Sequence, residues 1–295
     1  MIKVYTDAGS NLFPSLLKEK NWDIKVMPMT LRIDDKDLLC YSDDIDVPAI
    51  SHDFYEDLDS GKKKVTTSLV NPDTFLNAFE EDINAGNEII CFTMAKGISG
   101  TYQSACIAAN EINEEHDKKV VYVVNSATAS FGEGLQAVRA LKLIEQGMSL
   151  EELGNNCQEF AFKVRSEFTV GDVSSLIHTG RVTKTLASIA KILNLKVMLY
   201  GSNESKIEFS GKVHGRKLAI STLAKTCLKH IVNPDDQTVY IAHCDAFEDA
   251  SKLKEQLIAG GVKNVEIHWY DLITGTHVGK GTIALFYVGE NRDMK

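Results

Sequence analysis

The stretch Glu88-Ile-Ile-Cys-Phe-Thr-Met94 and the turn after it, Gly97-Ile98-Ser99-Gly100-Thr101-Tyr102-Gln103-Ser104-Ala105, decide the fold predicted for this chain. An apolar run of strand length enters a turn with two glycines and two hydroxyl residues, and a helix-forming segment leaves it. Backbone N–H groups at a helix N-terminus lack intrahelical partners and lie at the positive end of the helix dipole, so such a turn stabilises a carboxylate or a phosphate. The alternative is an ordinary strand-to-helix turn with an N-terminal cap.

The composition is typical of a globular protein large enough for two domains. The chain has 295 residues, of which 44% are hydrophobic and 25% are charged. Its net charge of -9 argues against broad binding to nucleic acid, because neutralising phosphates requires a surplus of Lys and Arg on one face. The six cysteines lie far apart and form no CxxC, so we interpret them as small buried side chains and predict no metal site.

The N-terminus and the apolar segments indicate where the protein works. Met1-Ile-Lys-Val-Tyr-Thr-Asp7 enters a strand directly, without a charged leader and an apolar core before it. No apolar stretch approaches the roughly 18 to 20 residues that a membrane helix needs. We therefore expect a cytoplasmic protein with no membrane-spanning segment.

The first half alternates strand-like and helix-like segments, as in a parallel α/β sheet. We predict strands at 2–6, 23–29, 88–94 and 119–124, and helices at 71–84, 101–115 and 132–146. Loops that carry function in such a sheet follow the carboxyl ends of the strands. Thr6-Asp7, residues 93–100 and Asn125-Ser126 all follow strand ends, so we expect them to meet in one crevice.

The second half has a different pattern, which predicts a second domain. A fresh N-cap at Ser149 begins a helix to about residue 163. Beyond it we predict strands at 167–170, 196–200, 206–209, 212–216, 238–243, 265–270 and 282–288, and helices at 184–193, 216–231 and 248–259. We therefore expect two domains, over residues 1–160 and 161–295.

One turn in the second half combines several glycines with a single histidine. In Gly275-Thr276-His277-Val278-Gly279-Lys280-Gly281 the three glycines indicate close backbone approach, with an imidazole directed at whatever approaches. A structural histidine is the alternative. Ser99 or Ser126 with His277 and Asp7 would make a serine hydrolase or acyltransferase, because such triads assemble from distant positions. The chain has no GxSxG elbow.

Seven motifs together resemble the bacterial DegV family over nearly the whole chain. They are Thr6-Asp7 with Ser10 and Leu12; Thr67-Ser68-Leu69 with Asn71-Pro72; Ile98 to Ala105; Ser126 with Gly132 and Gly134; Gly180-Arg181-Val182; Gly211-Lys212-Val213 with Arg216-Lys217; and Gly275 to Gly281. In that family the proteins are fatty-acid-binding subunits of fatty acid kinase. The resemblance implies an N-terminal parallel-sheet α/β domain, a C-terminal α+β domain with a mixed sheet, and one long-chain fatty acid buried between them.

The resemblance also implies the roles of individual residues. The fatty acid carboxylate is held by groups that match Thr67, Ser99 and Gly100, with His277 close by. A separate kinase subunit phosphorylates that carboxylate, so the binding protein is not an enzyme alone and needs no cofactor. The arginines that match kinase-docking positions are Arg181 and Arg216. The wall around the acyl chain is expected to draw on apolar side chains of the second domain, namely Phe168, Val170, Leu176, Ile177, Leu186, Ile189, Ile192 and Leu193.

Overall fold

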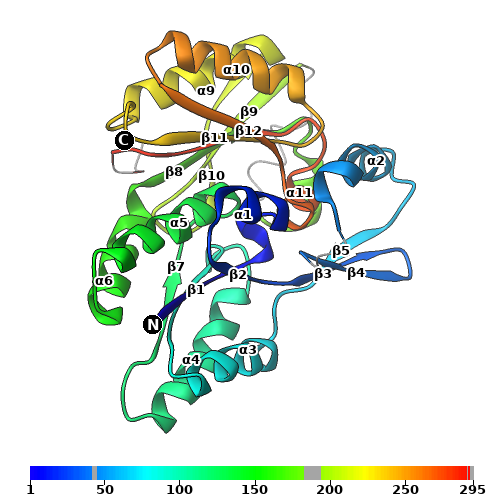
Figure 1. Cartoon of the computed structure of the whole chain (residues 1–295). Helices are drawn as coiled ribbons and strands as arrows, with labels where there is room; N and C mark the ends of the chain where they lie inside the picture. The colour runs from blue at the N-terminus through cyan, green and yellow to red at the C-terminus, as the bar shows by residue number, and fades with distance from the viewer. Residues whose placement is uncertain (42–44, 183–193, 291, 293–295) are drawn as a thin grey trace. The chain divides into compact units, whose positions relative to one another are not determined.

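The computed structural model describes residues 1–41, 45–182, 194–290 and 292, which divide into two units (Figure 1). The first unit comprises Met1–Asp46 and Thr66–Phe162, and the second comprises Val47–Val65 and Lys163–Lys295. Helix α2 (Val47–Asp59) therefore belongs by its contacts to the second unit, although most of the first unit follows it in the sequence. The division into domains at 1–160 and 161–295 stays a prediction.

A four-stranded parallel sheet forms the centre of the first unit. Its strands lie in the order β2 (Ile24–Met27), β1 (Ile2–Asp7), β6 (Glu88–Thr93), β7 (Val121–Asn125). Helices α3 (Pro72–Asn84) and α4 (Thr101–Glu115) pack together on one side, and α5 (Phe131–Glu145) and α6 (Leu150–Phe160) pack on the other (Figure 1). Because helices cover both faces, β6 is an almost continuous apolar run. The predicted parallel α/β architecture is confirmed.

The smaller elements of the first unit correct one prediction. A single strand over 23–29 is wrong: β2 ends at Met27, and β3 (Met29–Ile33) belongs to a separate three-stranded sheet with β4 (Lys36–Cys40) and β5 (Val65–Thr67). Pro28 separates the two strands and has no N–H group to donate to a sheet ladder. The 3-10 helix η1 (Ala8–Ser10) and helix α1 (Pro14–Lys20) follow β1.

The second unit contains a mixed six-stranded sheet, as predicted. The strand order is β10-β9-β8-β13-β11-β12, and of these pairs β11 and β12 alone are parallel. The strands are β8 (Val164–Thr169), β9 (Leu195–Gly201), β10 (Ile207–His214), β11 (Thr238–His243), β12 (Asn264–Trp269) and β13 (Ile283–Val288). Its described helices after β8 are α7 (Ser174–His178), α9 (Arg216–His230), α10 (Phe247–Ala259) and α11 (Leu272–Val278), and the 3-10 helix η2 (Ala161–Lys163) lies where the chain passes from the first unit to the second.

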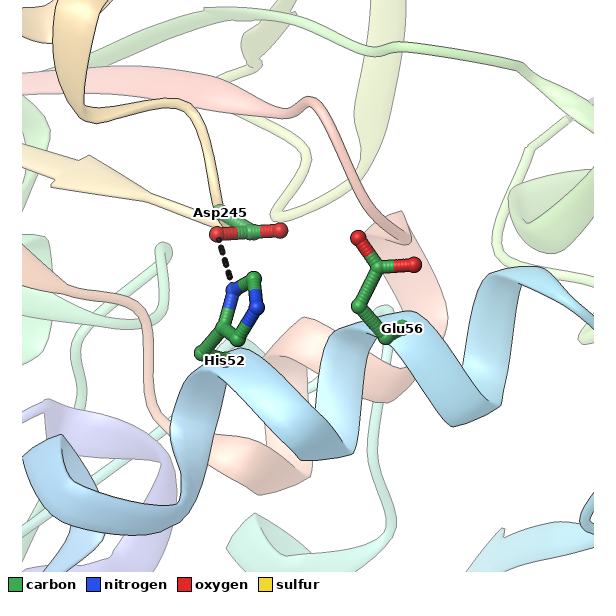
Figure 2. A group of neighbouring side chains, drawn as sticks. All are labelled: His52, Glu56 and Asp245. Carbon is green, nitrogen blue, oxygen red and sulfur yellow. Dashed lines mark hydrogen bonds and ion pairs between the residues drawn. The ribbon is translucent and has the colours of Figure 1, made fainter.

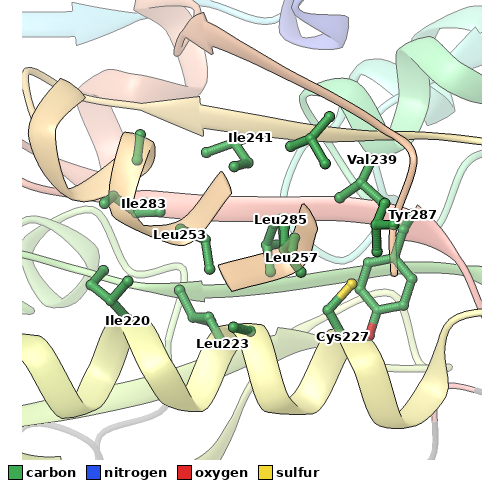
Figure 3. Close-up of a cluster of buried hydrophobic side chains, with 14 of the residues drawn as sticks. Ile220, Leu223, Cys227, Val239, Ile241, Leu253, Leu257, Ile283, Leu285 and Tyr287 are labelled. Carbon is green, nitrogen blue, oxygen red and sulfur yellow. The ribbon is translucent and has the colours of Figure 1, made fainter. Parts of the chain in front are cut away.

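The core of the second unit lies between this sheet and the helix pair α9 and α10. Figure 3 shows Ile220, Leu223 and Cys227 of α9 beneath aliphatic side chains of α10, β11 and β13. Leu253 and Leu257 of α10 are fully buried in the same cluster. Burying aliphatic side chains stabilises the fold by about 1.5 to 3 kcal/mol for each one, so this cluster anchors α9 and α10 to the sheet.

Two further predictions for the second unit differ from the structure. Residues 207–214 form one strand, β10, rather than two, and its pairing with β9 shifts register between Phe209 and Gly211. A bulge of this kind keeps the strand continuous although the hydrophobic pattern breaks. The apolar helix predicted at 184–193 lies outside the described residues.

Candidate functional site

The carboxyl ends of β1, β6 and β7 meet in the first unit, as predicted. The backbone N–H of Met94 donates to Asp7 Oδ2 at 2.9 Å. The N–H of Ser126 donates to the carbonyl of Thr93 at 3.2 Å, and that of Lys96 donates to Asn125 Oδ1 at 3.1 Å. These bonds join the three loops at one edge of the parallel sheet, which fixes the start of the Ser99-Gly100 turn.

Ser99 and Gly100 form the turn that begins helix α4. Ser99 Oγ lies 2.9 Å from Thr101 Oγ1 and accepts the Thr101 N–H at 3.2 Å, so it supports the turn just before the helix, whose N-cap is Gly100. The N–H groups of Tyr102 and Gln103 have no acceptor among the residues that the structure describes. They are first-turn donors of a 15-residue helix, an arrangement that favours an anion.

The segment that carries Thr67 lies beside this turn. Thr67 ends β5, and the N–H of Ser68 donates to the Thr30 carbonyl at 2.9 Å, which holds the segment to the three-stranded sheet. A Cβ atom added to Gly100 would lie 3.0 Å from Leu69 Cδ2. The structure therefore brings the 67–69 segment and the Ser99-Gly100 turn together. Thr67 and Ser99 both remain partly accessible.

Two buried carboxylates below these loops were not predicted as a pair. Asp7 is fully buried and accepts the N–H groups of Gly9 at 2.8 Å and Met94 at 2.9 Å. Glu133 Oε1 accepts the Thr6 hydroxyl and, at 3.1 Å, the Asp7 N–H. Burial raises the pKa of Asp7 to about 6, although its backbone hydrogen bonds act in the opposite direction. A Glu in the first turn of a helix that follows a strand was the available signal for Glu133.

Ser126, the second serine considered as a nucleophile, has a structural role in the described residues. Its hydroxyl is buried, donates to the Thr128 carbonyl at 3.1 Å and accepts the Thr128 N–H at 3.3 Å. The Asp7 carboxylate, proposed as the orienting acid, is hydrogen-bonded to backbone N–H groups. These contacts stabilise the loops after β1 and β7.

His277 belongs to the second unit and lies on α11. The helix begins at Asp271, whose Oδ1 accepts the Thr274 N–H at 2.7 Å. Burial, and then the positive charge of Arg181, lower the pKa of His277 to about 4. Arg181 follows α7, which packs against α11, and its guanidinium donates to the Thr179 carbonyl. A carboxylate placed near both groups would offset the positive charge of the guanidinium and stabilise the protonated imidazole.

The glycines around His277 approach other parts of the second unit. A Cβ atom at Gly275 would lie 2.0 Å from the Tyr55 hydroxyl oxygen, and one at Gly281 would lie 3.1 Å from Gly171 Cα. Gly279 ends α11 with a φ of 78°. The close backbone approach that the glycines predict is therefore made by other residues of the second unit, Tyr55 and Gly171.

The residues predicted to line the acyl chain are described only in part. Phe168, Val170 and Leu176 are buried and Ile177 is partly buried in the second unit. The predicted wall residues Leu186, Ile189, Ile192 and Leu193 lie outside the described residues. Burial of the first group is equally consistent with an ordinary hydrophobic core, so their role stays a prediction.

Arg216, predicted to dock a kinase, makes two contacts within the second unit. Its Nε lies 2.8 Å from Asp249 Oδ2, and its Nη2 donates to the Gly281 carbonyl at 2.6 Å. It lines a pocket of about 560 Å³ together with Lys196 and the exposed Phe247. Both contacts fix the position of the guanidinium, and the Asp249 carboxylate offsets part of the positive charge that the sequence places there.

One group of side chains has the donor types of a metal site. Figure 2 shows His52 and Glu56 on α2 facing Asp245, and His52 Nδ1 lies 3.0 Å from Asp245 Oδ1. Lys280 Nζ pairs with Glu56 and lies 3.4 Å from Asp245 Oδ2. Because an ammonium group already contacts both carboxylates, we interpret the group as an ion-pair cluster that links α2 to two loops of the second unit.

Comparison with known proteins assigns a family. A family model described as an uncharacterised protein of the DegV family matches residues 1–290. A DegV domain-containing protein of Clostridium perfringens, CPE0026, is 32% identical over 291 residues, which cover 98% of this chain and 98% of the relative. No described helix is long and apolar enough to cross a membrane.

Solved structures share the fold. A DegV family protein from Ruminococcus gnavus, refined with vaccenic acid, has a TM-score of 0.83 and 23% identity, and the match covers 97% of this chain and 99% of that one. The Fatty Acid Kinase (Fak) B3 protein of Streptococcus pneumoniae, loaded with linoleic acid, has a TM-score of 0.81 and 19% identity over 98% of this chain and 100% of that one. At these identities the likeness establishes the fold.

Proposed function

The chain belongs to the DegV family, and on this basis we propose that it binds a long-chain fatty acid and presents the carboxylate to a separate kinase subunit. The proteins of the same fold that were solved with vaccenic acid and with linoleic acid support a fatty acid as the ligand. In this proposal the chain has no turnover alone, because the kinase subunit supplies ATP and catalyses transfer of the phosphoryl group to the carboxylate oxygen.

One observation carries the proposal. The open N–H groups of Tyr102 and Gln103 lie at the start of α4, next to the Ser99 hydroxyl and beside the segment that holds Thr67. A carboxylate there would accept hydrogen bonds from the hydroxyls and from the helix N-terminus, and the helix dipole would stabilise its charge. We assign Thr67, Ser99 and Gly100 to the carboxylate.

The acyl chain and the carboxylate have different tasks in this proposal. Burying about 14 methylene groups contributes about 11 kcal/mol before the cost of association, whereas one hydrogen bond to a charged group contributes about 1.5 to 3 kcal/mol. The acyl chain therefore supplies most of the affinity, and the polar residues orient the carboxylate. Phe168, Leu176 and Ile177 are our candidates for the wall among the described residues.

We assign His277 to the same carboxylate and Arg181 and Arg216 to the kinase interface. Burial and the positive charge of Arg181 lower the pKa of His277. A negative charge near Arg181 is favourable, which supports the assignment of His277 to the carboxylate. The partial exposure of the Arg216 side chain, 24%, supports the assignment of Arg216 to the kinase interface.

Native purification followed by lipid analysis tests the proposal. We expect an organic extract of the recombinant protein to contain about one long-chain fatty acid per chain, because burial of the acyl chain approaches the roughly 12 kcal/mol of nanomolar binding. The delipidated protein should take up oleate or palmitate and show no esterase turnover. An extract without lipid, together with no uptake of added fatty acid, would refute the proposal.

A further inference from the structure

Tyr55 joins helix α2 to the helix that carries His277. The side chain is fully buried in the second unit, and its ring stacks on Trp269 with ring centroids 6.3 Å apart and an interplanar angle of 9°. Its hydroxyl lies 3.1 Å from the Tyr270 carbonyl and 3.2 Å from the Asp271 carbonyl. Since Asp271 is the N-cap of α11, the hydroxyl of Tyr55 contacts the first residues of that helix.

Gly275 provides the space that this contact needs. A Cβ atom at residue 275 would lie 2.0 Å from the Tyr55 hydroxyl oxygen and 2.9 Å from Tyr55 Cζ. No side chain fits there unless the ring moves. Tyr55 thus packs directly on the α11 backbone two residues before His277, and its position and that of the helix are mutually dependent.

Helix α11 depends on such contacts for its stability. It has seven residues, and isolated helices shorter than about 12 to 15 residues are marginal in water. Its N-terminus is capped by Asp271, and its C-terminal Gly279 packs near Ser175 of the α7 helix. Tyr55 adds a contact from α2, which lies 216 positions before Asp271 in the sequence.

We infer that Tyr55 is a positioning residue for His277. The aromatic ring and its hydroxyl hold the first turn of α11, two residues before His277, so that the partly buried imidazole keeps its position. This inference rests on the proposed function, in which His277 contacts the fatty acid carboxylate. The inference goes further, because it adds a residue of α2 that positions His277. None of the predicted site motifs includes α2.

The other contacts of α2 are weaker candidates for this role. His52 pairs with Asp245, and Glu56 pairs with Lys280. The side chains of His52 and Glu56 are 62% and 51% exposed, and exposed ion pairs contribute little to stability. A buried ring with a hydrogen-bonding hydroxyl contributes more, so substitutions at the two kinds of contact should have different effects.

The test compares Tyr55→Leu and Tyr55→Phe with His52→Ala as the matched control on α2. The pKa of His277 is measured by NMR titration of the ligand-free protein, and the Kd for oleate is measured for each variant. We expect Tyr55→Leu to raise the His277 pKa by about 1 unit or more, since water gains access to the imidazole. Oleate binding should weaken about five-fold. Tyr55→Phe should keep the His277 pKa and the Kd for oleate close to the wild-type values. His52→Ala should change neither quantity.

A double-mutant cycle separates failure of this inference from failure of the proposed function. In the His277→Ala background, Tyr55→Leu should no longer weaken oleate binding, because the residue through which it acts is absent. An unchanged His277 pKa in folded Tyr55→Leu, or in Tyr55→Met if the leucine variant does not fold, together with full additivity in the cycle, overturns the inference. If His277→Ala itself binds oleate as the wild type does, the carboxylate role of His277 is wrong, and the pKa measurement alone decides the positioning role of Tyr55.

Discussion

His277 is neutral at pH 7 because burial and, as the second cause, the positive charge of Arg181 lower its pKa to about 4. The two residues come from neighbouring elements of the second unit, since Arg181 follows α7 and α7 packs against α11. A protonated imidazole beside a guanidinium is unfavourable, and an anion placed near both would reverse that preference. Bound ligand and imidazole charge are therefore linked in the proposed site.

Binding of a fatty acid should raise the pKa of His277. If the oleate carboxylate approaches the imidazole, we expect the pKa to rise from about 4 by at least 1 unit. Arg181→Ala should raise it in the ligand-free protein, by less, since burial is the larger cause. Histidine NMR titrations with and without oleate measure both shifts. An unchanged pKa in the oleate complex would remove His277 from the carboxylate site.

Substitution of the carboxylate ligands should separate binding from turnover. Ser99→Ala or Thr67→Ala should weaken oleate binding by about 1 to 3 kcal/mol. Phosphorylation by the cognate kinase should decrease more, because transfer requires the carboxylate oxygen in near-attack geometry.

Ser68→Ala is the matched control for these variants, because Ser68 is an exposed hydroxyl next to Thr67. Oleate titrations and acyl-phosphate assays on all three proteins decide the outcome. Normal binding and full kinase activity in the Ser99 and Thr67 variants would show that Ser99 only supports the turn before α4 and that Thr67 is only a strand residue.

Asp7 should make the protein less stable as the pH rises from about 4 to 6. Its pKa is raised from 3.8 to about 6 by burial, so the folded protein retains a proton that the unfolded chain releases. The stabilisation is present below pH 4 and is lost by pH 6, and it amounts to about 3 kcal/mol at most.

Urea unfolding of Asp7→Asn and wild type across this pH range measures the effect. As the pH increases, the unfolding free energy of wild type should decrease relative to that of Asp7→Asn. Asp37→Asn is the control, because the hydrogen bond from Arg32 lowers the pKa of that exposed carboxyl and the variant should not show this trend. Parallel curves for Asp7→Asn and wild type would contradict the assignment of a proton to Asp7.

Charge reversal at Arg216 should impair a kinase partner without removing the lipid. We expect Arg216→Glu to leave the fatty acid content unchanged and to raise the concentration of lipid-loaded protein needed for half-maximal acyl-phosphate formation by about ten-fold, because an attractive contact becomes repulsive. Arg181→Ala should act in the same direction. The measurement is a titration of each variant against a fixed amount of the cognate kinase.

Asp249→Asn controls for the local structure. It breaks the pair between Asp249 and Arg216 and keeps the arginine charge, so its titration should resemble wild type. If Asp249→Asn and Arg216→Glu have equal effects, the defect comes from the lost internal pair. Wild-type titrations for Arg216→Glu and Arg181→Ala would remove this surface from the proposed interface.

Several features of the site were predictable because their signals are local. The apolar run at 88–94, the turn at Ser99-Gly100 and the helix at 101–115 follow one another directly in the sequence, and the structure confirms all three. Parallel strands place their carboxyl ends at one edge, so the meeting of the loops after β1, β6 and β7 followed from the strand predictions. The error at 23–29 arose where Pro28 was not treated as a strand break.

The sequence alone determined the parallel sheet of the first unit and the turn at the start of α4, since each depends on hydrophobic periodicity or on neighbouring residues. Periodicity also placed most strands of the second unit, whereas its mixed strand order was expected from the family resemblance. Tertiary structure decided the placement of short or isolated elements. Helix α11 has seven residues and α2 precedes most of the first unit in sequence, and both are held by packing around Tyr55 and Gly275. Contacts between residues about 220 positions apart leave no periodic signal, because their energy comes from burial and close fit rather than from local propensity.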